Sequence, residues 1–353
     1  MLAGVGVVQV GGALVFLALF GLLWPLGAAR RRARARRHRT RSLVLLLSVV
    51  GAEVVAAVAL LPLLLAVWTA SGDRSPMPEA PLAQGVTYER LALADARPVV
   101  VHVVRADTTV DGVEIVVSDV ETAPDPGPGV YHRATLARGE RTSSYVERSG
   151  VAAAINASFF DPFREFPPWS AYPGVGDVVY PLGFIVRDGK VHGEKWGDAT
   201  LSILSDGQIV VGELAEGAVT AISGRRMLLA DGVAVDEVFA MEPASGAATT
   251  PYARTALAAD SRTGIVYLVV VDGKQPGYSE GLTLAELAGL LAELGATDAI
   301  ELDGGGSATI AVNRDGSADV LNRTINTRIP GRERVVANQV GVKACPVDGC
   351  GSR

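Results

Sequence analysis

The first 68 residues consist of two long apolar runs separated by one basic segment. Residues 2–26 are apolar except for Gln9, and residues 42–68 form a second run in which Glu53 carries the only charge. Roughly 20 consecutive apolar residues are enough for a helix to cross the hydrocarbon core of a bilayer. The pattern therefore predicts two transmembrane helices within residues 1–69.

The segment between the two runs, residues 30–41, contains eight arginines. Basic loops beside membrane spans stay in the cytoplasm, so we expect a multi-pass protein of the cell membrane whose C-terminal domain lies on the extracellular side. Two alternatives stay open. The first run could be a secretory signal, although no basic segment precedes it, and the loop could bind nucleic acid instead of contacting membrane lipid. Glu53 is either a functional carboxylate or a residue of a helix contact.

Short β-branched runs separated by Asp-Gly pairs dominate the chain from about residue 86 to residue 344. Asp-Gly supplies the positive φ angles of tight turns, and the pattern predicts hairpins over residues 183–191, 201–211 and 227–235. The polar, proline-rich segment before this region predicts a semi-extended linker over residues 70–85. We therefore expect an α+β fold for residues 86–344, a mixed, strand-rich domain with several hairpins and few helices.

One stretch of this domain has the spacing of an amphipathic helix. Thr283 and Glu286 form a capping-box pattern, leucines then recur on one apolar stripe, and Gly295 follows them. Residues 298–302 come next and predict a strand that runs into three glycines. The helix and this strand are the clearest elements in the sequence.

The composition excludes some classes of protein. The chain is 49% hydrophobic and 20% charged, with 32 Lys and Arg against 38 Asp and Glu. Without the eight loop arginines and Glu53, 24 basic and 37 acidic residues remain, so the part of the chain after residue 68 carries about −13. Binding to nucleic acid requires clustered positive charge, so we expect no nucleic-acid partner for this domain. The sequence leaves the oligomeric state open.

Two cysteines, Cys345 and Cys350, lie near the C-terminus on either side of an Asp-Gly turn. In an oxidising exterior their short spacing predicts a disulfide within the tail of residues 345–353. A zinc site would need two more ligands nearby, and the domain's histidines are scattered along the chain. We therefore predict no metal site and no cofactor.

Two carboxylates precede the glycines. Glu301 and Asp303 are two residues apart, so an extended strand places both on one face, as acid–base chemistry requires. Glycine at three successive positions costs conformational entropy, and these residues either form a backbone nest for a phosphate or sugar or make a wide turn. The candidates in this segment are Glu301, Asp303, Gly304, Gly305, Gly306 and Ser307.

Two further strand ends carry polar residues. Residues 151–155 predict a buried strand that stops at Asn156, close to Phe159 and Phe160, and an amide beside aromatic rings can bind a sugar. An ordinary loop with a phenylalanine in the core is the alternative. Arg254 opens an apolar strand, where its guanidinium could hold a phosphate through two parallel hydrogen bonds or simply be solvated.

These motifs together resemble the phosphodiester glycosidase family. The resemblance covers roughly residues 152–342, in order along the chain. The segments that carry it are Ile155-Asn156 with Phe159-Phe160, residues 183–190, residues 228–232, Arg254-Thr255-Ala256, residues 271–288, residues 301–309 and residues 336–338. Two positions depart from the family pattern: Ala157-Ser158 stand where two glycines are usual, and Glu301 stands where Asn is common.

The resemblance implies an enzyme that hydrolyses a sugar-1-phosphodiester at the sugar carbon and releases free sugar and a phosphate monoester. Envelope or exopolysaccharide glycans are the expected substrates. The expected catalytic residues are Asp303, with Glu301 as second choice, and Arg254. Residues expected to bind substrate are Asn156, Phe160, Ser279, Gly304, Gly305, Gly306, Ser307 and Asn338. The alternative is a non-catalytic protein that binds envelope phosphoglycans or assists polysaccharide assembly.

Overall fold

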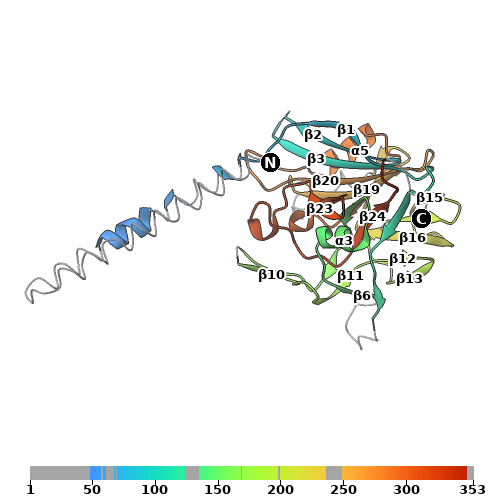
Figure 1. The fold of residues 1–353 in the computed structure, drawn as a ribbon, viewed down its shortest axis with the longest axis horizontal. Helices are drawn as coiled ribbons and strands as arrows, with labels where there is room; N and C mark the ends of the chain where they lie inside the picture. Colours follow the sequence, from blue (N-terminus) through green and yellow to red (C-terminus); the bar gives the residue numbers. More distant parts are fainter. Residues whose placement is uncertain are drawn as a thin grey trace, which may run out of the picture. The chain divides into compact units, whose positions relative to one another are not determined.

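The computed structural model describes residues 48–347, except 57–58, 61–66, 69, 95, 124–134, 168, 198 and 236–248 (Figure 1). The chain divides into two compact units, Met1–Trp68 and Thr69–Arg353. In the described part of the first unit, residues 48–56 are helical. Among described residues, no helix has the length and apolar character that a membrane crossing requires. The predicted span 2–26 and the basic loop lie outside the described residues, so the transmembrane hairpin stays a prediction.

An eight-stranded antiparallel sheet is the largest element of the second unit. Its strand order is β1-β2-β3-β20-β19-β21-β17-β18. The strands are β1 Met77–Ala83, β2 Val86–Leu93, β3 Val99–Asp107, β20 Ile265–Val271, β19 Arg254–Asp260, β21 Asp298–Leu302, β17 Met227–Ala230 and β18 Val233–Ala234. The central strands are apolar at nearly every position because both faces of the sheet are buried, one in each of two hydrophobic clusters.

One face of this sheet is covered by the helix α5, Leu284–Glu293. Leu284, Leu287 and Leu291 are fully buried against the sheet. Thr283 caps the helix, and Glu286 completes the capping box. The predicted helix is confirmed in position and in its apolar stripe.

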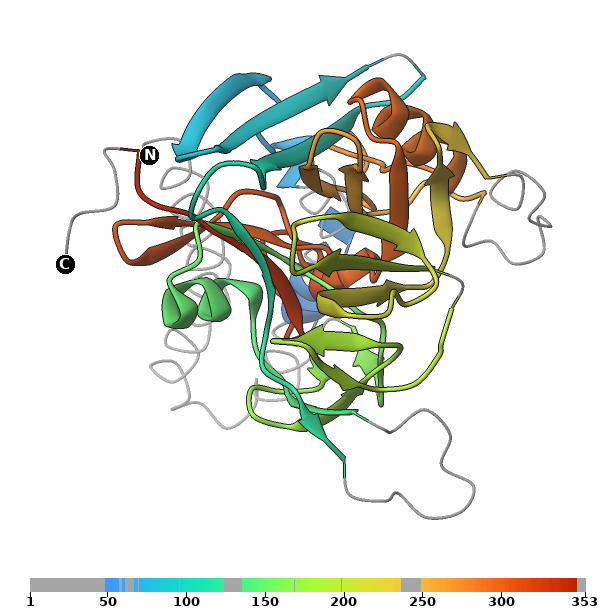
Figure 2. The same cartoon turned by 90° about the vertical axis from the view of Figure 1, so that its right-hand side faces the viewer.

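The other face packs against two five-stranded antiparallel sheets (Figure 2). The inward side chains of these sheets and of the eight-stranded sheet form one hydrophobic cluster, separate from the cluster under α5. The first has the order β23-β22-β7-β24-β4, and α3, Thr142–Ser149, packs on its outer face. Its strands are β23 Ser317–Val320, β22 Ile310–Arg314, β7 Ala153–Asn156, β24 Gln339–Lys343 and β4 Glu114–Val117. The second has the order β13-β12-β16-β14-β15, with strands β13 Lys190–His192, β12 Ile185–Arg187, β16 Ala218–Gly224, β14 Ala199–Leu204 and β15 Ile209–Gly212.

Two smaller sheets complete the described part of the domain. One has the order β5-β6-β11-β8, with strands β5 Glu121–Thr122, β6 Thr135–Arg138, β11 Val178–Pro181 and β8 Phe160–Asp161. The other is a hairpin of β9, Arg164–Phe166, and β10, Ser170–Tyr172. The strand-rich α+β class is confirmed, and all three predicted hairpins are present as β12–β13, β14–β15 and β17–β18.

The predicted linker is wrong over part of its length. Residues 77–83 form β1, which pairs with β2, so the folded domain begins before residue 86. The prolines that suggested a linker, Pro78 and Pro81, lie on the edge strand of the sheet, where a missing N–H does not break an inner ladder. The helix α3 was not predicted, because Arg141 at its N-cap makes no side-chain cap bond and its apolar stripe is short, and the carboxylate that bonds the Ser143 amide is the distant Glu333.

At the C-terminus, Cys345 is disulfide-bonded. Cys350 lies outside the described residues, and its pairing with Cys345 stays a prediction.

Candidate active site

The predicted carboxylates lie where strands of two sheets end close together. The start of β19 is antiparallel to the end of β21, with Thr255 opposite Leu302, so Arg254 and Asp303 are neighbours in space. The end of β7 joins them, because the Asn156 side chain reaches both Thr255 and the Asp303 backbone. Segments separated by about 150 residues of sequence therefore build one site.

Glu301 lies on β21 between two arginines. Its Oε2 accepts from Arg226 Nη1 at 2.6 Å, and its Oε1 accepts from Arg254 Nη1 at 3.4 Å. The Glu301 and Arg254 side chains are only 6% and 5% exposed. A buried carboxylate held by two guanidinium groups organises its surroundings and is poorly placed to exchange protons with a substrate.

Asp303 follows β21 and has a different environment. Burial raises the pKa of its carboxyl from 3.8 to about 6. A hydrogen bond with the Ser307 side chain and the Arg334 charge lower this pKa, whereas the Glu301 charge raises it. The effect of Glu301 is consistent with both carboxylates lying on one face. A carboxyl that titrates near neutral pH can both donate and accept a proton during a reaction.

Arg334 links Asp303 to the β9–β10 hairpin. Its Nη1 donates to Ser307 Oγ at 3.2 Å and its Nη2 donates to Glu165 Oε1 at 3.4 Å. Its guanidinium also lies over the Phe163 ring, 4.3 Å from the centroid. Arg334 is therefore a central residue of the site, and none of the sequence motifs indicated it. The signal that could have found it is the local excess of arginines in residues 323–334 of an acidic domain.

The three glycines are needed for close packing. A Cβ at Gly304 would lie 2.6 Å from the Ala253 carbonyl oxygen, and one at Gly305 would lie 2.7 Å from the Tyr252 ring. A Cβ at Gly306 would overlap the Arg334 guanidinium. Gly305 also has a positive φ of 62°. Glycine lets this turn, which is a 3₁₀ helix over Gly305–Ser307, lie against three other segments.

The predicted phosphate nest requires a correction. The Gly305 amide donates to Ala253 O at 2.8 Å, and the Ser307 amide donates to Gly304 O at 3.2 Å. Ser307 itself is fully buried, and its hydroxyl bonds to Arg334 and Asp303. The Gly304 amide bonds to the Asp303 carboxyl. Three of the four amides that were expected to bind a phosphate therefore bond within the protein.

The predicted role of Arg254 as a phosphate clamp also needs correction. Besides its ion pair with Glu301, its Nε donates to Leu282 O at 3.0 Å and its Nη2 donates to Thr250 O at 3.1 Å. The guanidinium is buried and lies over the Tyr252 ring. Burial lowers the pKa of Arg254, and the Glu301 charge opposes that shift. These bonds hold the guanidinium on protein acceptors and make Arg254 a positioning residue.

Asn156 is in the site but does not face a substrate. The side chain is fully buried, its Nδ2 donates to Asp303 O at 2.5 Å, and its Oδ1 accepts from Thr255 Oγ1 and from the Thr309 amide, each at 3.0 Å. These contacts join β7, β19 and the chain on both sides of the glycine turn. Asn156 therefore positions Asp303 and does not bind a sugar.

Three other predicted substrate-binding residues have structural roles. Asn338 is buried and bonds to the Ser158 amide and hydroxyl. Ser279 is buried, accepts from the Val100 amide and donates to Asp272 O. Phe160 packs in a small hydrophobic cluster and is 7% exposed. Their side chains contact protein partners because the strands that surround them supply those partners.

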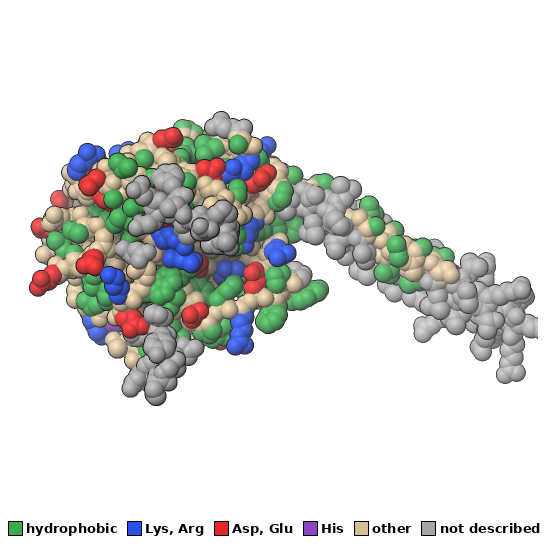
Figure 3. All heavy atoms as spheres, turned by 180° about the vertical axis from the view of Figure 1, so that it is seen from behind, with side chains coloured by type: hydrophobic (Ala, Val, Ile, Leu, Met, Phe, Trp, Pro, Cys, Tyr) green, Lys and Arg blue, Asp and Glu red, His purple; other side chains and the backbone are tan. Residues whose placement is uncertain are grey.

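Two exposed cations flank the site. Lys274 lies over the Tyr252 ring, 3.9 Å from its centroid, and its ammonium donates to the Tyr252 hydroxyl. Tyr252 in turn packs against Gly305. Arg225 lies over the Phe159 ring, and its amide donates to Glu301 O at 2.9 Å. The space-filling view from behind shows Lys and Arg side chains gathered near the middle of that face (Figure 3). Lys274 and Arg225 give positive charge to the surroundings of the site, in a domain that is acidic as a whole.

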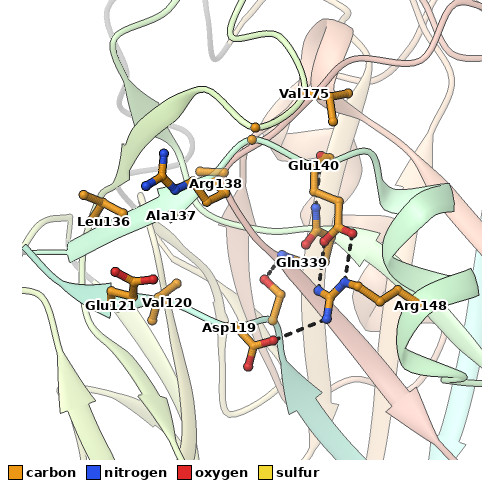
Figure 4. Close-up of a pocket in the computed structure, with 14 residues that line it drawn as sticks. Asp119, Val120, Glu121, Leu136, Ala137, Arg138, Glu140, Arg148, Val175 and Gln339 are labelled. Atoms are coloured by element: carbon orange, nitrogen blue, oxygen red, sulfur yellow. Dashed lines mark hydrogen bonds and ion pairs between the residues drawn. The ribbon is translucent and has the colours of Figure 1, made fainter.

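A pocket of about 330 Å³ lies away from these residues, between β6, α3 and the start of β24 (Figure 4). In this pocket Arg148 bonds to both carboxylate oxygens of Glu140 at 3.0 Å and to Asp119 at 3.3 Å. Its charge is thus balanced, and the pocket contains none of the predicted site residues. Within the described residues, no group of three or more His, Cys, Asp or Glu side chains is arranged to hold a metal ion.

Comparisons with known proteins place this geometry in a family. A family model described as phosphodiester glycosidase matches residues 149–343, more than half of the chain. This match includes the residues that carried the sequence resemblance and confirms it. A search of curated proteins gives no match.

Among solved structures, the similar ones include the zebrafish N-acetylglucosamine-1-phosphodiester alpha-N-acetylglucosaminidase catalytic domain, auto-inhibited by its pro-peptide. It shares 23% identity with a TM-score of 0.53 and covers 77% of this chain and 87% of that one. A hypothetical protein from Synechocystis shares 16% identity with a TM-score of 0.48, over 76% of this chain and 64% of that one. A protein from Burkholderia pseudomallei described as exported shares 17% identity with a TM-score of 0.42, over 70% of this chain and 74% of that one.

Proposed function

Because the chain belongs to the phosphodiester glycosidase family, we propose that it hydrolyses a sugar-1-phosphodiester at the sugar carbon. The family and the fold support a hydrolase of sugar phosphodiesters. In the proposed reaction, water replaces the phosphate at the sugar carbon. The carbon–oxygen bond breaks, and the products are the free sugar and a phosphate monoester.

The observation that carries this proposal is the environment of Asp303. Its carboxyl is half-buried and has a pKa of about 6, beside the Ser307 hydroxyl and the Arg334 guanidinium. Near neutral pH such a group can activate water or protonate a leaving oxygen, depending on its ionisation. Asp303 is the catalytic carboxylate of the proposal, and Glu301 positions the arginines around it.

The leaving group is a phosphate of low basicity, so stabilising its charge contributes more than protonating it. Lys274 and Arg225 replace Arg254 in this role, because both are exposed and both lie next to residues of the site. Arg254 and Arg226 hold Glu301 and, through it, the end of β21.

The location of the substrate follows from the N-terminal sequence. Two apolar runs and an arginine-rich loop favour a membrane-anchored chain with the catalytic domain outside the cell. Glycans of the cell envelope or exopolysaccharides that contain sugar-1-phosphodiesters are then the proposed substrates. A reporter that is active only in the cytoplasm, fused after Arg353, tests the topology, and its activity would refute this location.

The test of the reaction is hydrolysis in heavy-oxygen water, with a panel of methyl hexose-1-phosphate diesters that includes N-acetylglucosamine. We expect the label in the released sugar and none in the phosphate monoester. D303N should abolish turnover, whereas D315N, in an exposed hairpin turn, should keep it. Label in the phosphate would identify a phosphodiesterase instead. Tight binding without any turnover would favour the phosphoglycan-binding alternative.

A further inference from the structure

The β9–β10 hairpin presents large aromatic side chains to solvent. Phe163, Phe166 and Trp169 are 38%, 62% and 80% exposed, and they lie on or beside a two-stranded hairpin that projects from the domain near the label β10 in Figure 1. A folded domain rarely leaves several large apolar side chains exposed on one short element unless they contact a ligand or partner.

This hairpin is connected to the catalytic carboxylate by an unbroken set of polar contacts. Glu165 on β9 accepts from Arg334, Arg334 donates to Ser307, and the Ser307 hydroxyl bonds to Asp303. A second contact runs from Arg332 Nη2 to Trp169 O at 3.4 Å. The part of a substrate that extends beyond the scissile bond on this side of the site therefore meets the hairpin.

The two faces of the hairpin differ. Successive side chains of a strand point to opposite faces, so Phe163 and Glu165 share one face and Phe166 lies on the other. The contacts of both Phe163 and Glu165 with Arg334 identify the first face as the one toward the site. Trp169 lies in the turn before β10, and its carbonyl oxygen accepts from Arg332 of the basic segment. Phe163 and Trp169 form the aromatic rim of the site.

The segment beneath the hairpin is basic. Residues 323–334 contain four arginines and one glutamate, in a domain whose net charge is negative. Within it, Thr327 and Arg328 have positive φ angles of 53° and 63°, and Arg332 donates to Thr327 Oγ1 at 2.9 Å. Positive φ is costly for a β-branched residue, and such strain is found most often around functional sites.

We infer that the aromatic rim binds sugar rings of an anionic glycan polymer, on the polymer side of the bond cleaved at Asp303. This inference rests on the proposed function and extends it by naming a polymer with repeated phosphodiesters as the substrate class. Flat aromatic rings cover the apolar faces of sugars. Of the arginines in residues 323–334, the exposed Arg328 and the half-buried Arg332 complement the phosphodiesters of such a polymer.

A glycan fits these observations better than a membrane surface. Phe163 contacts Arg334 and the Trp169 carbonyl accepts from Arg332, whereas Phe166, which is also well exposed, lies on the strand face opposite Glu165. A hairpin that inserts into lipid would use Phe166 and Trp169 together at its tip. A rim for a bound chain uses the aromatic residues that contact arginines beside the site, Phe163 and Trp169.

The test compares two substrates with the full-length chain. The probes are the methyl diester of a hexose 1-phosphate and a poly(hexose 1-phosphate) of the same hexose. In W169A, we expect the ratio of kcat/KM for the polymer to that for the methyl diester to fall about tenfold, as for a tryptophan at the centre of an interface. F166A is the matched control, because this aromatic side chain is on the same hairpin and faces away, and its ratio should equal that of the wild type.

Several results would overturn the inference. An unchanged ratio in W169A would show that Trp169 does not bind the polymer. An equal fall in F166A would show that any apolar side chain of the hairpin contributes and that the rim is not specific. Reduced co-sedimentation of both variants with phosphatidylglycerol vesicles, with unchanged polymer kinetics, would assign the hairpin to lipid. If the wild type hydrolyses neither probe, the proposed function fails. Calorimetry would then measure binding of the polymer without turnover. If the aromatic rim binds the polymer, W169A should bind it more weakly than F166A.

Discussion

Glu301 and Asp303 are two residues apart at the end of one strand, yet their surroundings are different. Glu301 is buried and accepts hydrogen bonds from two arginines, Arg226 and Arg254. Asp303 is half-buried, bonds to a serine, and has its pKa raised to about 6, chiefly by burial. The same chemical group therefore has two different environments, each set by its neighbours.

This difference separates positioning from catalysis. A carboxylate bound by two guanidinium groups stabilises the fold around it, since the removal of one partner leaves the others buried and unpaired. A carboxyl with a raised pKa reduces stability whenever it is ionised, and in the proposed function Asp303 is the catalytic group. Substitutions at the two positions should thus have opposite consequences for activity and stability.

The largest expected effect is the loss of activity in D303N. Asn keeps the size of the side chain but can neither give nor take a proton, so kcat should fall roughly 10³- to 10⁴-fold, as for a general acid–base residue. Single-turnover kinetics on the best methyl diester of the panel would measure this. Far-ultraviolet circular dichroism would check that the fold is intact. A fall of less than tenfold would remove Asp303 from the reaction.

The next effect is the loss of stability in E301Q. The substitution removes the charge that pairs with Arg226 and Arg254, and breaking a buried ion pair costs about 3 kcal/mol or more of the free energy of unfolding. Denaturant unfolding of E301Q and of wild type at pH 7 measures the difference. If E301Q is as stable as wild type, the arginines find other partners and Glu301 is not the organising residue.

The pH dependence of stability should distinguish the two carboxylates further. The folded-state pKa of Asp303 is raised from 3.8 to about 6, so the folded protein binds more protons than the unfolded chain between these values. The contribution of Asp303 to stability is therefore present below about pH 4 and is lost as pH rises through 6. Relative to wild type, D303N should gain up to about 3 kcal/mol between pH 4 and pH 7. A difference that does not change with pH would contradict the raised pKa.

The smallest expected effect concerns Arg334, whose charge lowers the pKa of Asp303. R334M removes that charge, so the limb of the pH–rate profile that belongs to Asp303 should move to higher pH, by about one unit or less. R138M, at an exposed position on β6, is the control and should leave the limb in place. A shift to lower pH in R334M would mean that Arg334 acts on a different group.

Much of the local structure could be predicted from the sequence. The Asp-Gly turns of β12–β13 and β17–β18 have positive φ at Asp188 and Asp231, as such turns require, and short runs of mostly apolar residues flank both turns. Helix α5 begins at its capping box, and its leucines face the core. These features depend on residues within a few positions of each other, so a pattern in the sequence is sufficient to show them.

The roles of the polar residues could not be predicted in the same way. Asn156, Ser279 and Asn338 have the chemistry of sugar-binding residues, and each proved to be buried and bonded to protein groups far away in the sequence. The reverse applies to Arg334, whose only sequence signal was the local excess of arginines in residues 323–334. Whether a polar side chain meets substrate or protein depends on which strands pack around it.

From the sequence alone, the three hairpins, the amphipathic helix and two carboxylates beside three glycines could be predicted, whereas β1 was expected to be part of a linker. Short-range sterics and the hydrophobic period control these features. Only the tertiary structure decided that Arg226 and Arg254 bind Glu301, that the glycines allow close packing, and that burial raises the pKa of Asp303. Solvation and charge pairing are set by residues brought together from distant segments, so the division of function between the two carboxylates is a property of the fold.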